Sequence, residues 1–207
     1  SSVGDIRLGY QNGSSYGAAF GPAEWASDSY GGDVYFDSES IAGWEAATAG
    51  DFYYATVFHE IGHAMGLEHP HSEGTYGDVV LGVNTDTGSG GRDGQPYTLM
   101  SYASYQSGNI GFLNDLRAQT YMVDDIAALQ YLYGANLSTG AGADVYGAEL
   151  LTSDHPFEAS IWDAGGIDLI DWRHGDLASV IDLTPGSLSY FGGKVSSVSD
   201  AGIAQMK

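Results

Sequence analysis

The chain has 207 residues, of which 43% are hydrophobic and 13% aromatic, so it can bury a core and is not disordered throughout. Six basic against 27 acidic residues leave a formal charge of −21, which repels phosphate backbones and anionic lipids, excludes nucleic-acid and membrane-surface binding, and attracts divalent cations. No apolar run approaches the roughly 18–20 residues that span a bilayer, Ser1–Asp5 does not resemble a signal peptide, and without cysteine any extracellular stability has to come from packing or metal.

Short β-type runs between glycine-rich turns open the chain and predict strands at Ile6–Tyr10, Tyr16–Phe20 and Val34–Phe36. From about Asp51 to Met65 the apolar residues recur at helix spacing. Asp51 is placed to cap the start of this helix, and Gly66 is placed to end it. The apolar stripe consists of Phe52, Ala55, Phe58, Gly62 and Met65.

Residues 71–98 are rich in Gly, Asp, Ser and Thr without periodicity, which is typical of a functional or mobile loop. A second helix is predicted over about Tyr121–Tyr133 and ends at Gly134. Its apolar face consists of Ile126, Leu129, Leu132 and Tyr133. Strand-like pieces such as Ser160–Trp162 and Val180–Leu183 follow between Gly and Asp turns. This change of character predicts two domains, residues 1–135 and 136–207.

Four of the six histidines lie between positions 59 and 71. On a helix, His59 and His63 project from one face, so both imidazoles reach one ion at about 2.0–2.1 Å. Gly66 can adopt φ > 0 and turn the chain so that His69 returns as a third ligand. Glu60 lies about 100° round the helix, within reach of a water on the metal. Three neutral imidazoles leave one coordination position open, as in catalytic zinc sites.

A lone HExxH pattern has a simpler explanation, namely histidines on the solvated face of a helix. The extended pattern fixes three histidines, one glutamate and one glycine, which chance produces in well under ~1 in 1,000 chains. The sequence therefore predicts a zinc site. The other histidines after the motif are assigned to solvated or structural positions, and they are His71, His155 and His174.

This extended motif resembles that of the metzincin metallopeptidases. Residues 98–102, Thr-Leu-Met-Ser-Tyr, resemble their methionine-bearing turn (the Met-turn) in its serralysin form. The resemblance implies an α+β catalytic domain, with a twisted sheet, a zinc helix and a C-terminal helix, followed by the start of a calcium-binding β-roll. It also implies that Met100 packs beneath the zinc and that Tyr102 is a movable extra ligand. The simpler alternatives are core filling for Met100 and an ordinary surface tyrosine for Tyr102.

The similarity to serralysins runs from about Asp5 to Gly193. Residues 124–137 resemble the helix that leaves the catalytic domain, and residues 162–168 resemble the entry to the β-roll. Serralysin catalytic domains place two strands and a long helix before the strand that Ile6–Tyr10 resembles, and nonapeptide Gly/Asp repeats follow the roll's first turns. Because the chain contains neither, we expect it to be the middle of a longer mature protease or a shortened relative.

By the same resemblance, calcium joins two loops. The first loop provides Gly140, Gly142 and Asp144, and the second provides Asp163, Gly165 and Asp168, whose carbonyl and carboxylate oxygens suit Ca²⁺. A second site would use Gly166 and Asp168 with partners from the absent repeats. The family usually has Arg where Gly140 stands and Thr where Asp144 stands; the second change adds a negative charge. A polar turn cluster without an ion is the alternative.

The resemblance implies a secreted, monomeric zinc endopeptidase that cleaves extended protein substrates with broad specificity and meets a proteinaceous inhibitor. In this mechanism Glu60 is the general base and Tyr102 donates a hydrogen bond to the oxyanion. The family's substrate-binding edge strand corresponds to Gly17, Ala18, Ala19 and Phe20, to which a peptide adds antiparallel. Two other classes stay open: a calcium-dependent binding or surface-layer module with a relic zinc site, and an inactive fragment of a larger assembly.

Overall fold

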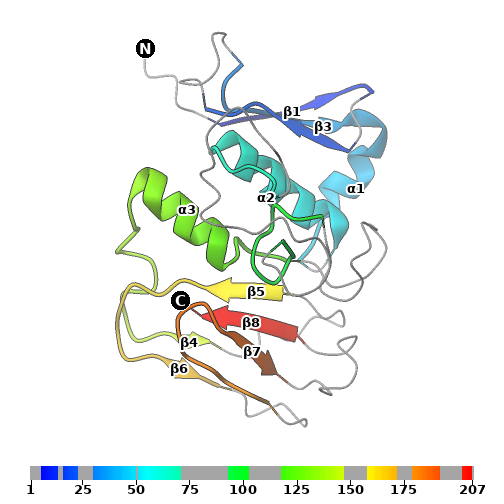
Figure 1. Cartoon of the computed structure of the whole chain (residues 1–207). Helices are drawn as coiled ribbons and strands as arrows, with labels where there is room; N and C mark the ends of the chain where they lie inside the picture. Colours follow the sequence, from blue (N-terminus) through cyan, green and yellow to red (C-terminus); the bar gives the residue numbers. More distant parts are fainter. Residues whose placement is uncertain are drawn as a thin grey trace.

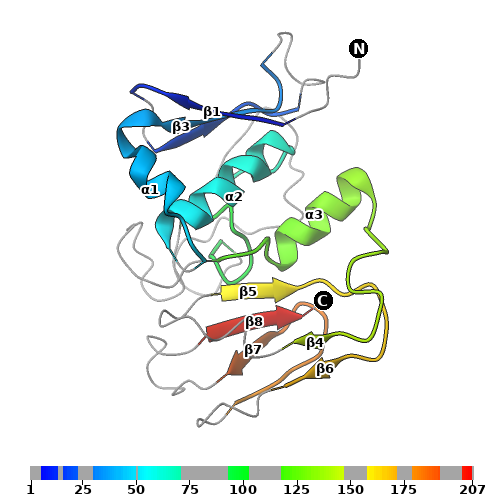
Figure 2. The ribbon, with the colours of Figure 1, turned by 180° about the vertical axis from the view of Figure 1, so that it is seen from behind.

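The computed structural model describes residues 6–13, 16–22, 30–49, 51–70, 93–102, 118–146, 158–171, 179–191 and 202–206. The helices are α1 (Ile41–Glu45), α2 (Phe52–Ala64) and α3 (Val123–Tyr133), with a 3-10 turn η1 (Ser38–Ser40) before α1. The strands are β1 (Arg7–Gln11), β2 (Gly17–Ala19), β3 (Asp33–Asp37), β4 (Val145–Tyr146), β5 (Glu158–Ile161), β6 (Leu169–Ile170), β7 (Leu188–Phe191) and β8 (Gly202–Met206). Helices α2 and α3 lie between the N-terminal sheet and the C-terminal strands (Figures 1 and 2), an arrangement of the predicted α+β class. None of the helices in these ranges has the length and apolar character needed to span a membrane.

The N-terminal sheet has the order β1-β3-β2, with β1 parallel and β2 antiparallel to β3. All three predicted strands are therefore confirmed, within one or two residues at their ends. Val34 and Phe36 of β3 point toward α1 and α2 and form a core with Trp44 and Ala64. The short helix α1 was not predicted from the sequence, and it brings the Trp44 ring to 4.8 Å from that of Phe36. This core fixes α2 beneath the sheet.

Helix α2 has the predicted ends. The Asp51 side chain accepts a hydrogen bond from the Tyr54 N–H at 2.7 Å, and Gly66 leaves the helix at φ 95°. The buried side of α2 differs from the predicted stripe, because it includes two polar residues; it consists of Ala55, His59, Glu60, Gly62 and Ala64. Phe52, Phe58 and Met65 are only half-buried. The inner face of α2 thus combines core packing with a polar site.

Helix α3 starts two residues later than predicted and stops at Gly134, which has φ 83°. Its Ala128 packs with Leu67 and Met100, so α3 lies against the end of α2 and the Met-turn segment. Tyr133 does not belong to the buried face, contrary to the prediction, since it is 63% exposed. Its hydroxyl instead donates to the Met65 carbonyl at 2.8 Å and ties α3 to the end of α2.

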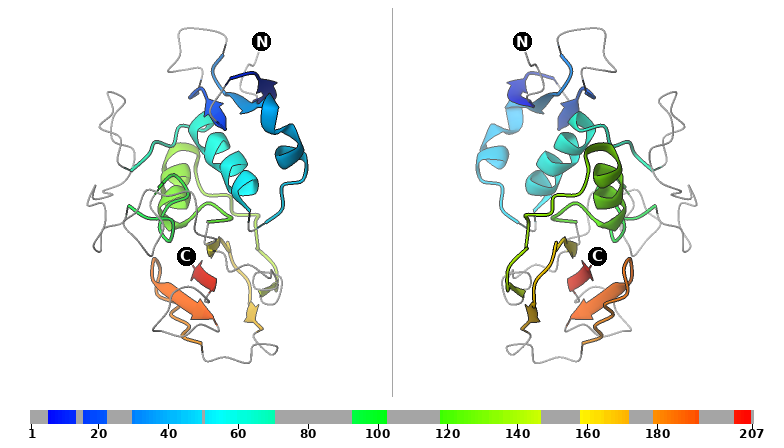
Figure 3. Two further views of the ribbon diagram at one scale, coloured as in Figure 1. Left: turned by 90° about the vertical axis from the view of Figure 1, so that its right-hand side faces the viewer. Right: turned by 90° about the vertical axis from the view of Figure 1, so that its left-hand side faces the viewer.

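The C-terminal strands form two small sheets, with β4 parallel to β6 and the order β5-β8-β7 in the other. Side views show these strands at the end of the molecule opposite the N-terminal sheet (Figure 3). The Ser160 N–H donates to the Thr120 hydroxyl at 2.7 Å and connects β5 to the segment before α3. The predicted strand at Val180–Leu183 is wrong, because only an isolated bridge forms there. The Asp182 side chain accepts from the Thr184 N–H at 2.9 Å, which favours a turn over a strand. Residues 71–92, His155 and His174 lie outside the described residues.

Candidate active site

The three histidines of the extended motif converge on one point. Nε2 of His69 lies 3.0 Å from Nε2 of His59 and 3.0 Å from Nε2 of His63. Nδ1 of His59 lies 3.0 Å from the Leu99 carbonyl oxygen, and Nδ1 of His63 lies 2.8 Å from that of Leu67. Because a carbonyl only accepts, both rings carry their proton on Nδ1 and present an Nε2 lone pair to the shared point.

This donor set fits zinc. Ligands about 2.0–2.1 Å from one tetrahedral ion lie about 3.3 Å from one another, close to the observed spacing of the nitrogens. The two carbonyls orient ligand rings in the way that outer partners do in zinc sites. Burial lowers the pKa of His63 below its ordinary value of 6.5, which favours the neutral ring that a metal requires. The triad, a group of side chains able to hold a metal ion, therefore implies zinc.

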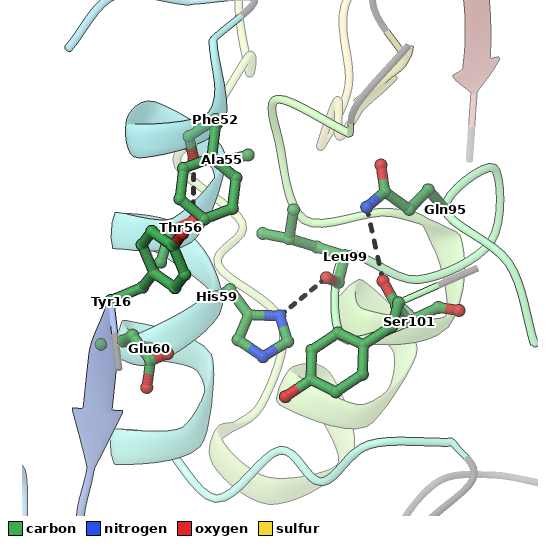
Figure 4. A pocket seen from close by; sticks show the side chains of 11 residues that line it. Tyr16, Phe52, Ala55, Thr56, His59, Glu60, Gln95, Leu99 and Ser101 are labelled. Carbon is green, nitrogen blue, oxygen red and sulfur yellow. Dashed lines mark hydrogen bonds between the residues drawn. The ribbon is translucent and has the colours of Figure 1, made fainter. Parts of the chain in front are cut away.

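Glu60 follows His59 on α2, and its side chain lies beside β2 (Figure 4). Its side chain is 8% exposed, and burial raises its pKa from 4.5 to about 7. Gly17 passes so close that a Cβ atom there would lie 2.7 Å from Cγ of Glu60. A carboxyl group with a pKa near neutrality can both take up and release a proton at physiological pH.

Met100 packs against α2, and Tyr102 lies against two of the histidine rings. Met100 is 1% exposed, and its sulfur lies 2.7 Å from where a Cβ atom on Gly62 would be, so it packs directly beneath α2. The Tyr102 ring stacks on that of His59, with 5.5 Å between centres and 22° between planes, and lies 4.5 Å from the ring of His69. Burial and the nearby Glu60 raise the pKa of Tyr102 above 10.0, which keeps its hydroxyl protonated.

A cavity of about 400 Å³ opens beside His59 and Glu60, between α2 and the Met-turn. Tyr16 and Phe52 form one wall with their rings 5.2 Å apart and nearly perpendicular, and Leu99 lies on the opposite wall (Figure 4). This wall could not be predicted from the sequence, since nothing local relates Tyr16 to a helix that begins 36 positions later. Tyr16 also has φ 65°, a backbone conformation that residues other than glycine rarely adopt.

Two buried carboxylates behind the site were also missed. Asp125, at the start of α3, accepts from the Thr98 hydroxyl at 2.6 Å, the Leu99 N–H at 2.7 Å and the Met122 N–H at 2.8 Å. Burial raises the pKa of Asp125 from 3.8 to about 6, although these hydrogen bonds oppose the shift. The second is Asp93, which accepts from the Ser101 hydroxyl at 2.5 Å. For Asp125 the sequence contained only a weak signal, namely two acidic residues in the first turn of a predicted helix.

The acidic residues predicted to bind calcium come together in the second half of the chain. Asp144, Asp163 and Asp168 offer oxygen atoms that all lie within 4.8 Å of one another. Oδ2 of Asp144 is buried and has no hydrogen-bond partner among the described residues. Gly166 approaches the first loop so closely that a Cβ atom there would lie 1.6 Å from the Gly142 carbonyl oxygen. Gly140 and Gly165 both have positive φ, as tight turns of these two loops require.

Comparison with known proteins gives consistent matches. The family signature of reprolysin-like metallo-peptidases, family M12B, matches residues 11–136. The chain is 34% identical over 183 residues to serralysin of Proteus mirabilis, which covers 82% of this chain and 36% of that protein. It is 33% identical over 208 residues to metallopeptidase AprA of Pseudomonas marginalis (93% and 42%) and 38% identical over 161 residues to a serralysin C of Dickeya chrysanthemi (70% and 32%). The chain thus spans well under half the length of these curated relatives.

Proposed function

Because the chain belongs to the serralysin-type metzincin metallopeptidases, we propose that it hydrolyses internal peptide bonds of proteins as a secreted zinc endopeptidase. The observation that carries this function is the convergence of three Nε2 atoms beside a buried carboxyl group whose pKa is about 7. We further propose a catalytic domain at residues 1–135 and a calcium-binding region at residues 136–207. The chain would act as a monomer, on protein substrates and with a proteinaceous inhibitor as a further partner.

In this proposal, His59, His63 and His69 hold the zinc, and Tyr102 is an additional ligand. Bound there, zinc supplies a Lewis acid that activates a water molecule and polarises the scissile carbonyl. Glu60 accepts a proton from the attacking water and returns it to the leaving amine. The protonated Tyr102 hydroxyl donates a hydrogen bond to the oxygen on which negative charge develops. Met100 holds the floor of the site by packing against α2.

The substrate would bind along β2. This strand lies at the edge of its sheet and carries Gly17, Ala18 and Ala19, with Phe20 directly after it. An extended peptide can add to this edge antiparallel through main-chain hydrogen bonds, which favours broad specificity. Gly17 brings the edge against Glu60, so the scissile bond of such a peptide would pass over the general base.

Hydrolysis of casein by the zinc-loaded chain tests the proposed function. We expect cleavage that a zinc chelator abolishes and that added Zn²⁺ restores. A chain that binds one zinc ion per molecule yet cleaves neither casein nor unfolded peptides would contradict the proposal. It would favour the alternative of a binding module with a relic zinc site.

Substitution of Gly17 by alanine should lower kcat by about 10², because displacement of a catalytic group by about 1 Å has an effect of this size. The new methyl group would lie 2.7 Å from Cγ of Glu60, and the Glu60 side chain would have to move. The fold should be retained, since the atoms that the methyl group meets belong to a side chain rather than to the backbone. The control is Gly9→Ala in β1, whose methyl group would meet only the Tyr35 ring at 3.6 Å. Equal rates for the two variants would contradict the placement of Glu60 beside β2.

Tyr102→Phe should lower kcat by about 10²–10³ with little change in KM, because it removes one donor to the oxyanion. The zinc content should stay the same, since the three imidazoles remain. Steady-state kinetics together with metal analysis measure both quantities. An increase in KM with an unchanged kcat would instead assign Tyr102 to ground-state substrate binding.

We also propose that Ca²⁺ joins the loops of Asp144, Asp163 and Asp168. The buried Oδ2 of Asp144 supports this assignment, because a carboxylate oxygen without a hydrogen bond is costly unless a cation faces it. The carbonyl of Gly142 and the turns at Gly140, Gly165 and Gly166 would complete the oxygen ligands. The parallel pair β4 and β6, each of which follows one of these loops, is compatible with the first turn of a β-roll.

Calcium should raise the melting temperature and protect residues 136–170 from proteolysis. Binding to the native state alone stabilises by RT ln(1 + [L]/Kd), about 2.7 kcal/mol at a hundredfold excess over Kd. Asp168→Asn should remove most of this protection and leave zinc bound, whereas Glu39→Gln, an equal charge change at an exposed position, should leave it intact. Mg²⁺ at matched ionic strength controls for screening. Equal protection by both ions would leave only non-specific neutralisation of the acidic surface.

A further inference from the structure

Two buried polar side chains form hydrogen bonds with Ser101, the residue directly before Tyr102. The Ser101 hydroxyl donates to Oδ1 of Asp93 at 2.5 Å, and the Ser101 carbonyl accepts from Nε2 of Gln95 at 3.4 Å (Figure 4). Oε1 of Gln95 in turn accepts from the Ala118 N–H at 3.1 Å, so Gln95 connects Ser101 to the segment before α3. Ser101 is 1%, Asp93 6% and Gln95 8% exposed.

The Asp93–Ser101 hydrogen bond acts on a different part of the turn from the contacts that orient the metal ligands. The first half of the turn is held by Asp125, which binds the Thr98 hydroxyl and the Leu99 N–H. The Leu99 carbonyl faces Nδ1 of His59, so that half already orients the ligand ring. Ser101 lies beyond Met100, on the side from which the Tyr102 side chain leaves the turn.

We propose that Asp93 is a positioning residue for Tyr102 and that it acts through the Ser101 hydroxyl. This inference deepens the proposed function and rests on it, because Tyr102 matters only if its hydroxyl serves the reaction. A hydrogen bond to a carboxylate is short and about twice as strong as one between neutral groups, so it holds the peptide before Tyr102 in one orientation. With the backbone of Tyr102 fixed in this way, its phenol moves between the ligand rings and the substrate by side-chain torsions alone.

Double-mutant kinetics test the pathway through Tyr102. Ser101→Ala and Asp93→Ala should each lower kcat about tenfold with KM nearly unchanged, and Asp93→Asn, which keeps an acceptor for the Ser101 hydroxyl, should recover most of the loss. In the Tyr102→Phe background, Ser101→Ala should cost nothing further, since the group that it positions is absent. Ser189→Ala, which also removes a buried and hydrogen-bonded serine hydroxyl but in β7, is the matched control. A tenfold loss in both backgrounds would overturn the proposal and assign Ser101 a merely structural role.

A spectroscopic readout separates this inference from the proposed function. Imidazole sites also bind Cu²⁺, and a tyrosine that loses its proton and binds Cu²⁺ as a phenolate gives a charge-transfer absorption that three histidines alone do not give. The copper-loaded wild type should show this band, Tyr102→Phe should lack it, and Ser101→Ala should weaken it while Ser189→Ala does not. A weakened band in a chain that cleaves no peptide would support the positioning role and contradict the proposed function. A band of unchanged intensity in Ser101→Ala would overturn the positioning role, even if the wild type is an active protease.

Discussion

Glu60→Gln should lower kcat for peptide hydrolysis by about 10²–10⁴, the usual contribution of a general base, while zinc binding is retained. The amide has nearly the shape of the carboxyl group, so it can occupy the same buried space beneath Gly17. It cannot accept a proton from water at any accessible pH. The loss should appear in kcat and in kcat/KM alike, because the proton moves only in the transition state. Steady-state kinetics at matched zinc content measure it.

Glu45→Gln provides the control for this prediction. Glu45 is exposed at the end of α1, and its substitution changes the net charge by the same amount without touching the site. It should leave kcat within a factor of two or so of the wild-type value, as expected for a surface change. If Glu60→Gln retained the turnover of Glu45→Gln, Glu60 would not be the base and the proposed mechanism would be wrong.

The parts of the molecule that the sequence predicted well depend on local geometry. His59 and His63 are four residues apart on one helix, and the helix ends depend on Asp51 and Gly66, which each act within a few residues. The third histidine follows the same logic, since a glycine at φ 95° reverses the chain just before it. Such features can be predicted because each involves one short segment.

The parts that the sequence did not predict depend on contacts between distant segments. Asp125 lies in the first turn of α3, where an acidic residue is ordinary, yet its carboxylate is buried against Thr98 and Leu99, 26 and more positions earlier. Tyr133 has the apolar spacing of a core residue, but it faces solvent because α3 packs through Ala128. Hydrophobic periodicity identifies a face of a helix, whereas the partner that covers this face is set by the tertiary fold.

Asp125 therefore connects two elements that the site needs. It joins the start of α3 to the turn whose Leu99 carbonyl orients His59, so the ligand geometry and the packing of α3 depend on one side chain. Oδ2 accepts from the two backbone N–H groups, and Oδ1 accepts from the Thr98 hydroxyl. Asparagine can keep both backbone hydrogen bonds through its amide oxygen, and its amide N–H can donate to the Thr98 hydroxyl in place of accepting from it. Alanine can reproduce none of them.

Asp125→Ala should destabilise the chain by about 3 kcal/mol or more relative to Asp125→Asn at every pH, because both variants lack the ionisable carboxyl group and only alanine leaves the buried donors without an acceptor, at about 1–3 kcal/mol each. This is a large share of the roughly 5–15 kcal/mol by which domains are stable, so weakened zinc binding should accompany it. Urea unfolding of zinc-loaded protein measures the change, with Asp125→Asn as the matched variant of nearly equal shape. Equal destabilisation by Ala and Asn would show that the charge, rather than the hydrogen bonds, holds the turn.

The pH dependence of Asp125→Asn against the wild type isolates the charge. Burial raises the pKa of Asp125 from 3.8 to about 6, so the folded state holds the proton more tightly than the unfolded chain. Below pH 4 the group is protonated in both states and costs nothing; as the pH rises through 6, ionisation favours the unfolded chain by about 3 kcal/mol, at 1.36 kcal/mol per pH unit. The Asn variant has no such group. Its free energy of unfolding should therefore rise relative to that of the wild type between pH 4 and 6, and above pH 6 the difference should stay constant. Protonation of the histidine ligands affects both proteins alike and cancels in the difference. A difference that stays constant with pH would mean that the Asp125 carboxylate is ionised throughout, held by its three donors.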